Sequence, residues 1–176
     1  MERLVAVRER GIDVTVITNS LAANNQFSVH AGYAPSRKPL LEAGVKLFEV
    51  RPDATMEGAT LVAASGAKAT LHTKAFLIDR TEVFIGSFNF DPRSAWLNTE
   101  MGVLIDNHAM ALRFADYVQS HMRDQAYEVF LDENGELRWR AFDDGEERIY
   151  DKEPESTWWD RFKVGFVRIL PIKRQL

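Results

Sequence analysis

The sequence predicts an α/β domain of the layered kind, in which helices flank a mixed β-sheet. Two helix–strand units occupy residues 2–18 and 34–50, and an apolar hairpin follows at 71–89. Hydrophobic residues make up 45% of the 176 residues and charged residues 27%, which is ordinary for a globular protein. A chain of this length can bury a sizeable core, so we expect one domain with short additions.

The first two units are predicted from local signals. Residues 2–9 should form a helix that ends at Gly11, and the β-branched run 12–18 should form a strand. A second helix is expected over about 34–43, ended by Gly44, and a second strand over 45–50.

The hairpin at 71–89 is the centre of the chain. The run Phe76-Leu77-Ile78 has no polar alternation, which predicts a strand covered on both faces. His72 and Lys74 lie two residues apart, so their side chains should point to the same side. Two basic groups at the end of a core strand are costly to bury unless an anion or a carboxylate meets them. This pattern is a first indication of a phosphate site.

The second half of the chain adds strands and two helices. We expect a third core strand at 98–105, a helix at about 107–123 and a β-meander with a turn at Asn134-Gly135. An amphipathic helix should run from 156 and stop at Pro171. The predicted division is an α/β domain at 1–125, a β-meander appendage at 126–155 and a basic, aromatic helix at 156–176.

Charge is unevenly distributed. The net charge is −4, but residues 156–176 hold five basic side chains and one acidic side chain and carry +4. The remaining acidic body argues against nucleic acid as a partner, since nucleic-acid binding depends on phosphate neutralisation. A basic tail with Trp158 and Trp159 favours a helix lying on an anionic membrane surface. Packing of its aromatic stripe on the core is an equally weighted alternative.

Several classes of protein are excluded by composition. The absence of cysteine excludes disulfides and thiolate chemistry, and four scattered histidines do not suggest a metal site. No apolar run approaches the roughly 20 residues of a membrane span, and the first residues lack a signal-peptide core. We therefore expect no metal and no cofactor.

One spacing carries the chemistry: His72-x-Lys74-x4-Asp79, followed by Gly86-Ser87-x-Asn89. Lys74 can hold phosphate oxygens as a point charge, and Ser87 and Asn89 can add neutral donors. His72 is then free to attack phosphorus and form a phospho-histidine. The alternative is that His72 is a structural core residue whose hydrogen bonds are made within the protein.

Two carboxylates accompany these residues. Glu100, on the predicted third strand, is placed to hold the other ring nitrogen of His72 and fix its tautomer. Asp79 stands at the strand end, an odd number of residues from Lys74, so we expect it to hold the turn or a backbone amide.

The stretch LHTKAFLIDRTEVFIGSFNFDPRSAWLNTEMGVLID resembles the phospholipase D superfamily, and most of all the second catalytic motif of bacterial cardiolipin synthases of the C type. The segments VTVITNSLAANN, VHAGYAPSRKPLLEAGVKLFEV and PESTWWDRFKVGFVRILPI are similar to the same group. The resemblance implies a phosphatidyltransferase that passes a phosphatidyl group from a phosphatidylglycerol-type phospholipid to His72 and then to a lipid hydroxyl. It implies His72 as nucleophile or general acid and Lys74, Ser87 and Asn89 as phosphate ligands. Glu100 would be the orienting group and Asp79 the carboxylate of the motif.

The chain departs from this family in one respect. Members build one active site from two such motifs, whereas His30, His108 and His121 have no lysine two residues later. We therefore expect the C-terminal half of an active site, which needs a first-motif half or a second copy of the chain. A single-motif homodimeric phosphodiesterase or nuclease, or an inactive lipid-binding fragment, are the alternatives. The expected location is cytoplasmic, peripheral at the inner face of a bacterial membrane.

Overall fold

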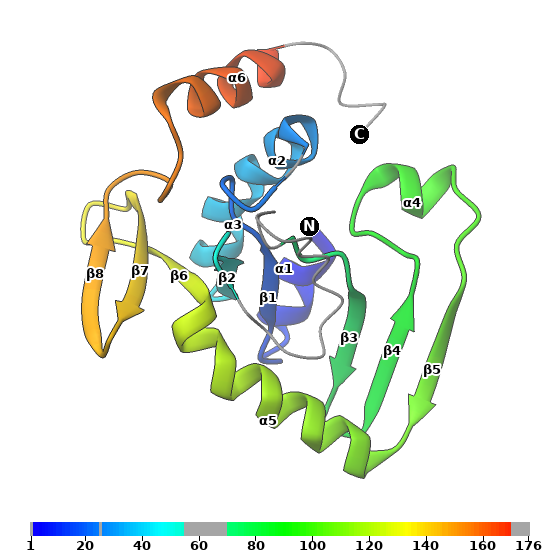
Figure 1. The fold of residues 1–176 in the computed structure, drawn as a ribbon. Helices are drawn as coiled ribbons and strands as arrows, with labels where there is room; N and C mark the ends of the chain where they lie inside the picture. Colours follow the sequence, from blue (N-terminus) through cyan, green and yellow to red (C-terminus); the bar gives the residue numbers. More distant parts are fainter. Residues whose placement is uncertain (1, 25, 55–69, 170–176) are drawn as a thin grey trace.

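The computed structural model describes residues 2–24, 26–54 and 70–169 (Figure 1). Five strands form a mixed sheet in the order β1-β2-β6-β7-β8, in which β1 and β2 are parallel and the other neighbours antiparallel. These strands are β1 (Thr15–Asn19), β2 (Lys46–Val50), β6 (Ala126–Leu131), β7 (Leu137–Asp143) and β8 (Glu146–Tyr150). A smaller antiparallel sheet contains β3 (Lys74–Ile78), β4 (Glu82–Gly86) and β5 (Gly102–Asp106). The predicted fold class is confirmed.

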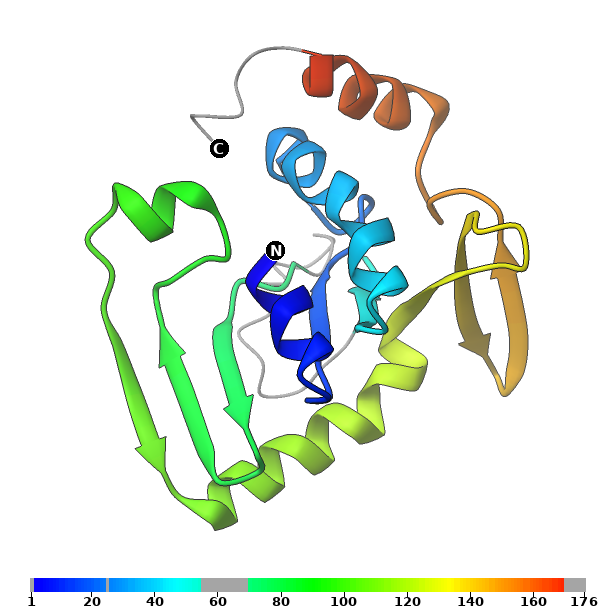
Figure 2. The ribbon, with the colours of Figure 1, turned by 180° about the vertical axis from the view of Figure 1, so that it is seen from behind.

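The helices lie on both faces of the five-stranded sheet (Figure 2). On one face, Val16, Leu47 and Val129 pack with residues of the segment that runs from α2 to α3. On the other face, Ile17 and Phe48 pack against Met122 of α5. Because strand side chains alternate, neighbouring residues of β1 and β2 serve opposite layers. The helices are α1 (Glu2–Glu9), α2 (Phe27–Tyr33), the 3₁₀ turn η1 (Ala34–Ser36), α3 (Arg37–Glu42), α4 (Pro92–Trp96), α5 (His108–Gln125) and α6 (Trp158–Ile169).

The predicted β-meander is present, but it does not stand apart from the core. Residues of β6 pair with β2, from Leu47 opposite Val129 to Val50 opposite Ala126. Tyr127 and Trp139 of the meander are buried in the main hydrophobic cluster. The small antiparallel sheet is therefore the one that contains the central hairpin, and residues 126–150 extend the mixed sheet. The division of the chain at residue 125 stays a prediction.

The central hairpin turns at Asp79 and Arg80. Both have positive φ, 49° and 55°, and the amide of Thr81 donates to the carbonyl of Ile78 at 3.0 Å. Two successive left-handed residues match the right-handed twist of the flanking strands.

The prediction that the strand of Phe76, Leu77 and Ile78 is covered on both faces is wrong for the described part of this chain. Phe76 and Leu77 are only half-buried, and Ile78 is 42% exposed. Neither face of this strand is therefore fully closed to solvent.

Two boundaries also differ from prediction. The third strand starts at Gly102 rather than at 98, so Glu100 precedes β5. The second helical region starts earlier than expected, at Phe27, and includes His30.

The C-terminal helix α6 starts with a capping box, in which Thr157 and Asp160 bond each other's backbone amides. Its predicted end at Pro171 lies outside the described residues. Within the described ranges, none of the helices is both long and apolar enough to cross a membrane.

Candidate active site

His72 and Lys74 lie at one end of the small sheet and contact each other. His72 precedes β3, and Lys74 is the first residue of that strand. The ammonium nitrogen of Lys74 is 3.0 Å from Nε2 of His72 and 2.9 Å from its carbonyl oxygen. An ammonium group can only donate, so Nε2 accepts and the ring proton is on Nδ1. The two side chains thus point to the same side, as the spacing predicts.

Ser87 and Glu100 lie beside this pair. Lys74 pairs with Gly86 across the hairpin, which puts Ser87 next to it. The hydroxyl of Ser87 donates to Oε2 of Glu100 at 2.5 Å and accepts from the amide of Met101 at 3.0 Å. The hydrogen bond from Ser87 contributes most to lowering the pKa of Glu100, so this carboxylate stays ionised.

Burial lowers the pKa of Lys74 from its usual value, and the negative charge of Glu100 offsets part of that effect. The carboxylate therefore helps to keep the ammonium group charged. The amide of Asn98 donates to Oε1 of Glu100 at 3.2 Å and holds it from the other side. Glu100 thus bonds Ser87 and Asn98 here, and it is Lys74 that contacts the ring of His72. Glu100 as the group that orients His72 stays a prediction.

The remaining residues of the motif lie in loops. Asn89 is exposed in the loop between β4 and α4. Asp79 lies in the turn at the opposite end of β3, roughly 16 Å along the strand from Lys74. The structure therefore brings together His72, Lys74, Ser87 and Glu100 and places Asp79 in the turn, the role that its position in the sequence indicates.

Aromatic rings form the apolar floor next to these groups. The ring of Phe76 stacks on that of Phe84 with centroids 5.2 Å apart and meets Phe90 edge-on. The Phe84 ring lies over Gly102, where a Cβ would overlap it, and a Cβ on Gly86 would lie 2.6 Å from the Met101 carbonyl oxygen. Sequence reasoning missed these paired glycines, although their place on adjacent strands next to an aromatic residue is a usable signal.

Trp96 of α4 is 77% exposed, so this aromatic residue packs neither in the core nor in the wall of a pocket.

Comparison with known proteins agrees with this geometry. Residues 1–122 match the family model described as "Cardiolipin synthase, PLD-like domain". The chain belongs to this family. It is 42% identical to cardiolipin synthase C of Escherichia coli over 176 residues, which are 97% of this chain and 37% of that protein.

Other relatives of this cardiolipin synthase domain are more distant. An uncharacterised protein of Helicobacter pylori strain 26695 is 29% identical over 92% of this chain and 32% of its own length. Cardiolipin synthase A of Proteus mirabilis is 33% identical over 58% of this chain and 17% of its own. The chain thus spans about a third of the length of the relatives that it matches over most of its residues.

A solved structure shows the same fold. The phospholipase D family member Nuc of Salmonella typhimurium superposes with a TM-score of 0.50 at 22% identity, covering 73% of this chain and 72% of that one.

A second histidine cluster lies in the interior of this cardiolipin synthase domain. His30 is fully buried, and its Nε2 is 2.9 Å from both Oε1 of Glu153 and a terminal nitrogen of Arg37. Arg37 also donates to Glu49 at 2.7 Å, and Glu49 accepts from Trp139 at 2.9 Å. His30 therefore lies neither at the surface nor at the mouth of the site, and it is inside α2 rather than at its cap.

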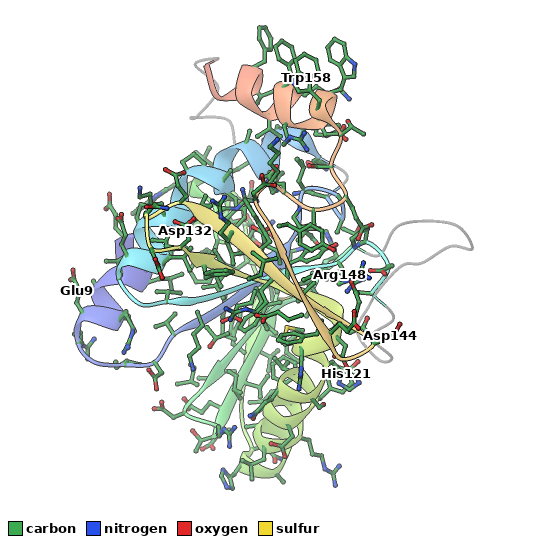
Figure 3. All side chains as sticks on the ribbon, turned by 90° about the vertical axis from the view of Figure 1, so that its left-hand side faces the viewer. Glu9, His121, Asp132, Asp144, Arg148 and Trp158 are labelled. Carbon is green, nitrogen blue, oxygen red and sulfur yellow. The ribbon has the colours of Figure 1, made fainter. Side chains whose placement is uncertain are left out.

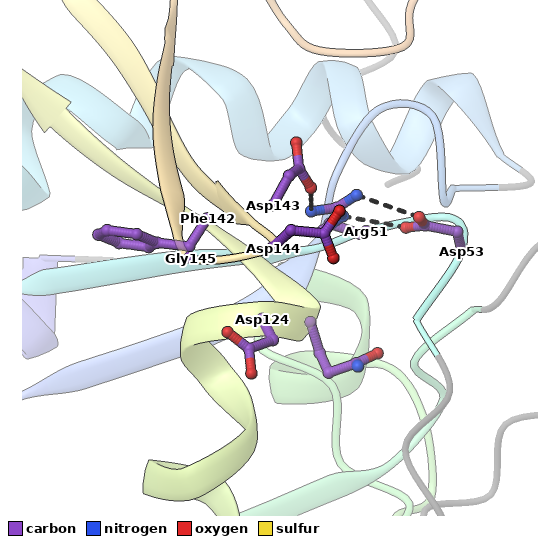
Figure 4. Close-up of a pocket in the computed structure, with 8 residues that line it drawn as sticks. Arg51, Asp53, Asp124, Phe142, Asp143, Asp144 and Gly145 are labelled. Atoms are coloured by element: carbon purple, nitrogen blue, oxygen red, sulfur yellow. Dashed lines mark hydrogen bonds and ion pairs between the residues drawn. The ribbon is translucent and has the colours of Figure 1, made fainter.

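A pocket of about 380 Å³ lies elsewhere, where β2, α5 and the β7–β8 turn meet (Figure 4). Arg51 occupies its centre, donating to Asp53 at 3.0 Å and to Asp143 at 2.6 Å. The cation and these carboxylates satisfy one another, so this pocket ties three elements together rather than resembling a phosphate site.

Proposed function

We propose that this chain supplies one half of the active site of a phosphatidyltransferase of the cardiolipin synthase kind, with His72 as the covalent nucleophile. The observation that carries this proposal is the direct contact between the His72 ring and the Lys74 ammonium group at an exposed end of the small sheet. Membership in the cardiolipin synthase domain family supports the substrate class, a phosphatidylglycerol-type phospholipid.

The geometry suggests how the nucleophile is released. The Lys74 ammonium donates to the lone pair of Nε2, which is the pair that would attack phosphorus. When a phosphodiester enters, its non-bridging oxygens are stronger acceptors for that ammonium, because they carry negative charge. Lys74 would turn to the phosphate, with Ser87 and Asn89 as further donors, and Nε2 would be free to react.

The covalent step makes one bond and breaks one. Nε2 forms a bond to phosphorus, and the bond from phosphorus to the headgroup oxygen breaks. The departing alkoxide needs a proton from the opposite side of the phosphorus. A hydroxyl of a second phosphatidylglycerol-type lipid then attacks the phosphorus and gives its proton to the group that had protonated the alkoxide. The bond from phosphorus to Nε2 breaks, which completes the transfer and restores the ring.

The proton donor must come from outside this chain's own motif. None of His30, His108 and His121 has a lysine two residues later. Leu104 lies on the face of the small sheet that carries Lys74, Phe76 and Phe84, and its exposed side chain offers an apolar surface for the second half. We therefore place opposite His72 either a half with a first motif or a second copy of this chain.

The membrane surface is proposed as a second partner, through α6. Val164 of this helix is buried against Leu21 and Ala31, while four aromatic side chains on other faces of the helix are exposed by half or more. These four are Trp158, Trp159, Phe162 and Phe166. Trp158 points away from the sheets (Figure 3).

The position of α6 suits this role. In Figure 1, α6 lies at the end of the molecule where β3 begins and β4 ends, and α4 lies at the same end. A helix with exposed indoles in a segment of net charge +4 suits the interface of an anionic bilayer. A membrane bound there would present its phosphates on the side of the His72–Lys74 pair, consistent with a peripheral position at the inner face of a bacterial membrane.

Lipid transfer is the direct test. The chain is incubated with phosphatidylglycerol vesicles, alone and together with the part of the E. coli relative outside the matched region, and cardiolipin is measured by mass spectrometry. We expect synthesis only in the mixture, with an acid-labile phosphatidyl adduct on His72. Absence of transfer in both samples would contradict the proposal. Hydrolysis of DNA or a simple phosphodiester by a homodimer would support the alternative activity.

Vesicle co-sedimentation tests the membrane surface. Replacing Trp158 and Trp159 by Ala should weaken binding to anionic vesicles by about tenfold or more, because complete burial of a large apolar side chain contributes roughly 1.5–3 kcal/mol. Ile78→Ala is the control, since Ile78 is also exposed but lies at the end of β3 away from α6. Equal binding of all three proteins would exclude α6 as the contact.

A further inference from the structure

The segment that leads into His72 is held by a single side chain of the other sheet. The amide of Leu71 donates to Oδ1 of Asn19 at 2.7 Å, and Nδ2 of Asn19 donates to the carbonyl of Leu71 at 2.9 Å. Asn19 is the last residue of β1. One side-chain amide therefore satisfies both backbone groups of the residue immediately before the nucleophile.

This contact bridges two separate sheets. β1 is the edge strand of the five-stranded sheet and β3 the edge strand of the three-stranded sheet, and no ladder joins them in the described part of the chain. Leu71 also packs with Val50 and Ile17. Asn19 thus makes the two backbone hydrogen bonds that a neighbouring strand would otherwise make to Leu71.

We propose that Asn19 is a positioning residue for the His72–Lys74 pair. Its side-chain amide holds the backbone of Leu71 in place. This fixes the position of the next residue, His72, so that its ring contacts the Lys74 ammonium. This inference deepens the function proposed above and depends on it for its catalytic meaning, whereas the positioning itself can be measured without turnover.

The chemistry requires an amide of this length. Asn offers an acceptor and a donor on one planar group, which match the N–H and C=O of one residue. Asp keeps the acceptor but places a second oxygen against the Leu71 carbonyl. Ala removes both bonds. Both substitutions should therefore release Leu71, and Asn19→Asp does so with almost no change of volume.

Nuclear magnetic resonance of the ¹⁵N-labelled chain tests the proposal. In the wild type, the Leu71 amide should be protected from hydrogen exchange although it lies outside any strand. Asn19→Ala and Asn19→Asp should accelerate this exchange by tenfold or more and shift or broaden the ring signals of His72, while those of His108 and His121 remain unchanged.

Asn24→Ala is the matched control, because the side chain of Asn24 accepts only from the nearby exposed amide of Gln26 among the side-chain contacts that the structure gives it. An unprotected Leu71 amide in the wild type would overturn the proposal without any variant. Unchanged His72 signals in a folded Asn19 variant would overturn it as well.

Activity separates this inference from the proposed function. In the mixture that synthesises cardiolipin, Asn19→Asp should lower kcat with little change in KM, because the reacting groups are misplaced while lipid binding is retained. If no transfer is found for the wild type, the proposed function fails and the exchange and ring measurements still decide the role of Asn19.

Discussion

Two histidines in this protein have similar charged neighbours, a cation and a carboxylate, but one is buried and the other is exposed. His30 contacts a cation, Arg37, and a carboxylate, Glu153, and Arg37 also pairs with Glu49, all buried or nearly so. His72 meets Lys74 beside Glu100, at an exposed end of a sheet. In the interior, the charged groups of the cluster are paired with one another. At the edge, the ammonium group donates to a neutral ring and to a carbonyl, so it can exchange these acceptors for a phosphate.

The difference shows that residue type alone does not distinguish a structural ion cluster from a reactive one. A buried cation between two carboxylates cannot leave them without exposing unpaired charge, which is expensive. An ammonium bonded to neutral acceptors at the surface loses little when an anion replaces them. We therefore expect substitutions in the His30 cluster to change stability and substitutions in the His72 cluster to change activity.

The largest expected effect is on turnover. His72→Ala should reduce lipid transfer by roughly a thousandfold or more, since it removes the group that forms the covalent bond. The thermal midpoint should remain within a few degrees of the wild type, because the side chain is exposed. Transfer is measured in the mixture described above, with His108→Ala as the control. A His72→Ala protein with near-normal turnover would remove the distinction between the two clusters.

Next in size is the effect of opening the buried cluster. Arg37→Leu should lower the free energy of unfolding by about 3–5 kcal/mol, because it leaves Glu49 and Glu153 without their cation. Urea titration measures the change. Arg148→Ala, which removes an exposed arginine 3.7 Å from Asp143, should cost about 0–1 kcal/mol. Equal losses in the two variants would show that the interior cluster is not special.

Acid unfolding should report the same cluster. Burial opposes ionisation of Glu153, but the hydrogen bond with His30 and the charge of Arg37 outweigh it and lower its pKa to about 2. A carboxyl group with a depressed pKa stabilises the fold above its ordinary pKa, and this contribution disappears as the pH falls toward 2. A shift from 4.5 to about 2 corresponds to about 3 kcal/mol.

Glu153→Gln should therefore reduce the loss of stability between pH 4.5 and pH 2. Unfolding free energies across that range test this, with Glu128→Gln, at a half-exposed pair with Arg140, as the control. An unchanged acid limb in Glu153→Gln would indicate that this carboxylate is not held ionised by its neighbours.

The smallest expected effect is a shift of the alkaline limb of the pH–rate profile. Burial lowers the pKa of Lys74 and Glu100 raises it, so Glu100→Gln should move that limb to lower pH. Lys74→Arg should retain its charge and move the limb in the opposite direction, at whatever reduced rate it supports. If neither substitution shifts the alkaline limb, titration of Lys74 does not control the reaction.

The sequence is sufficient to predict that His72, Lys74 and Ser87 come together, because the determinants of this contact are local. A two-residue spacing places His72 and Lys74 on one side, and hairpin pairing brings Ser87 beside them. The amphipathic character of α6 is likewise a local periodicity. By contrast, whether its aromatic residues face the core or solvent depends on which side Val164 packs, and this is decided by α2.

The features that the sequence could not predict involve distant partners. His30 and Glu153 are 123 residues apart, and no spacing rule relates them. The same holds for Asn19 and Leu71, which are 52 residues apart. The apolar run Phe76-Leu77-Ile78 misled the prediction for a different reason. Its hydrophobicity indicates that the strand is suited to burial, but not whether this chain supplies the residues that would bury it.

The two facing glycines beneath Phe84 have a consequence for any mutational survey of this protein. Gly86 and Gly102 are paired across β4 and β5, one residue before Ser87 and two residues after Glu100, and neither position has room for a methyl group. Alanine at either would displace a ring or a carbonyl and, through it, the serine–carboxylate bond. Such a survey would score both positions as essential to catalysis, although each glycine contributes only a hydrogen atom beside the proposed phosphate site.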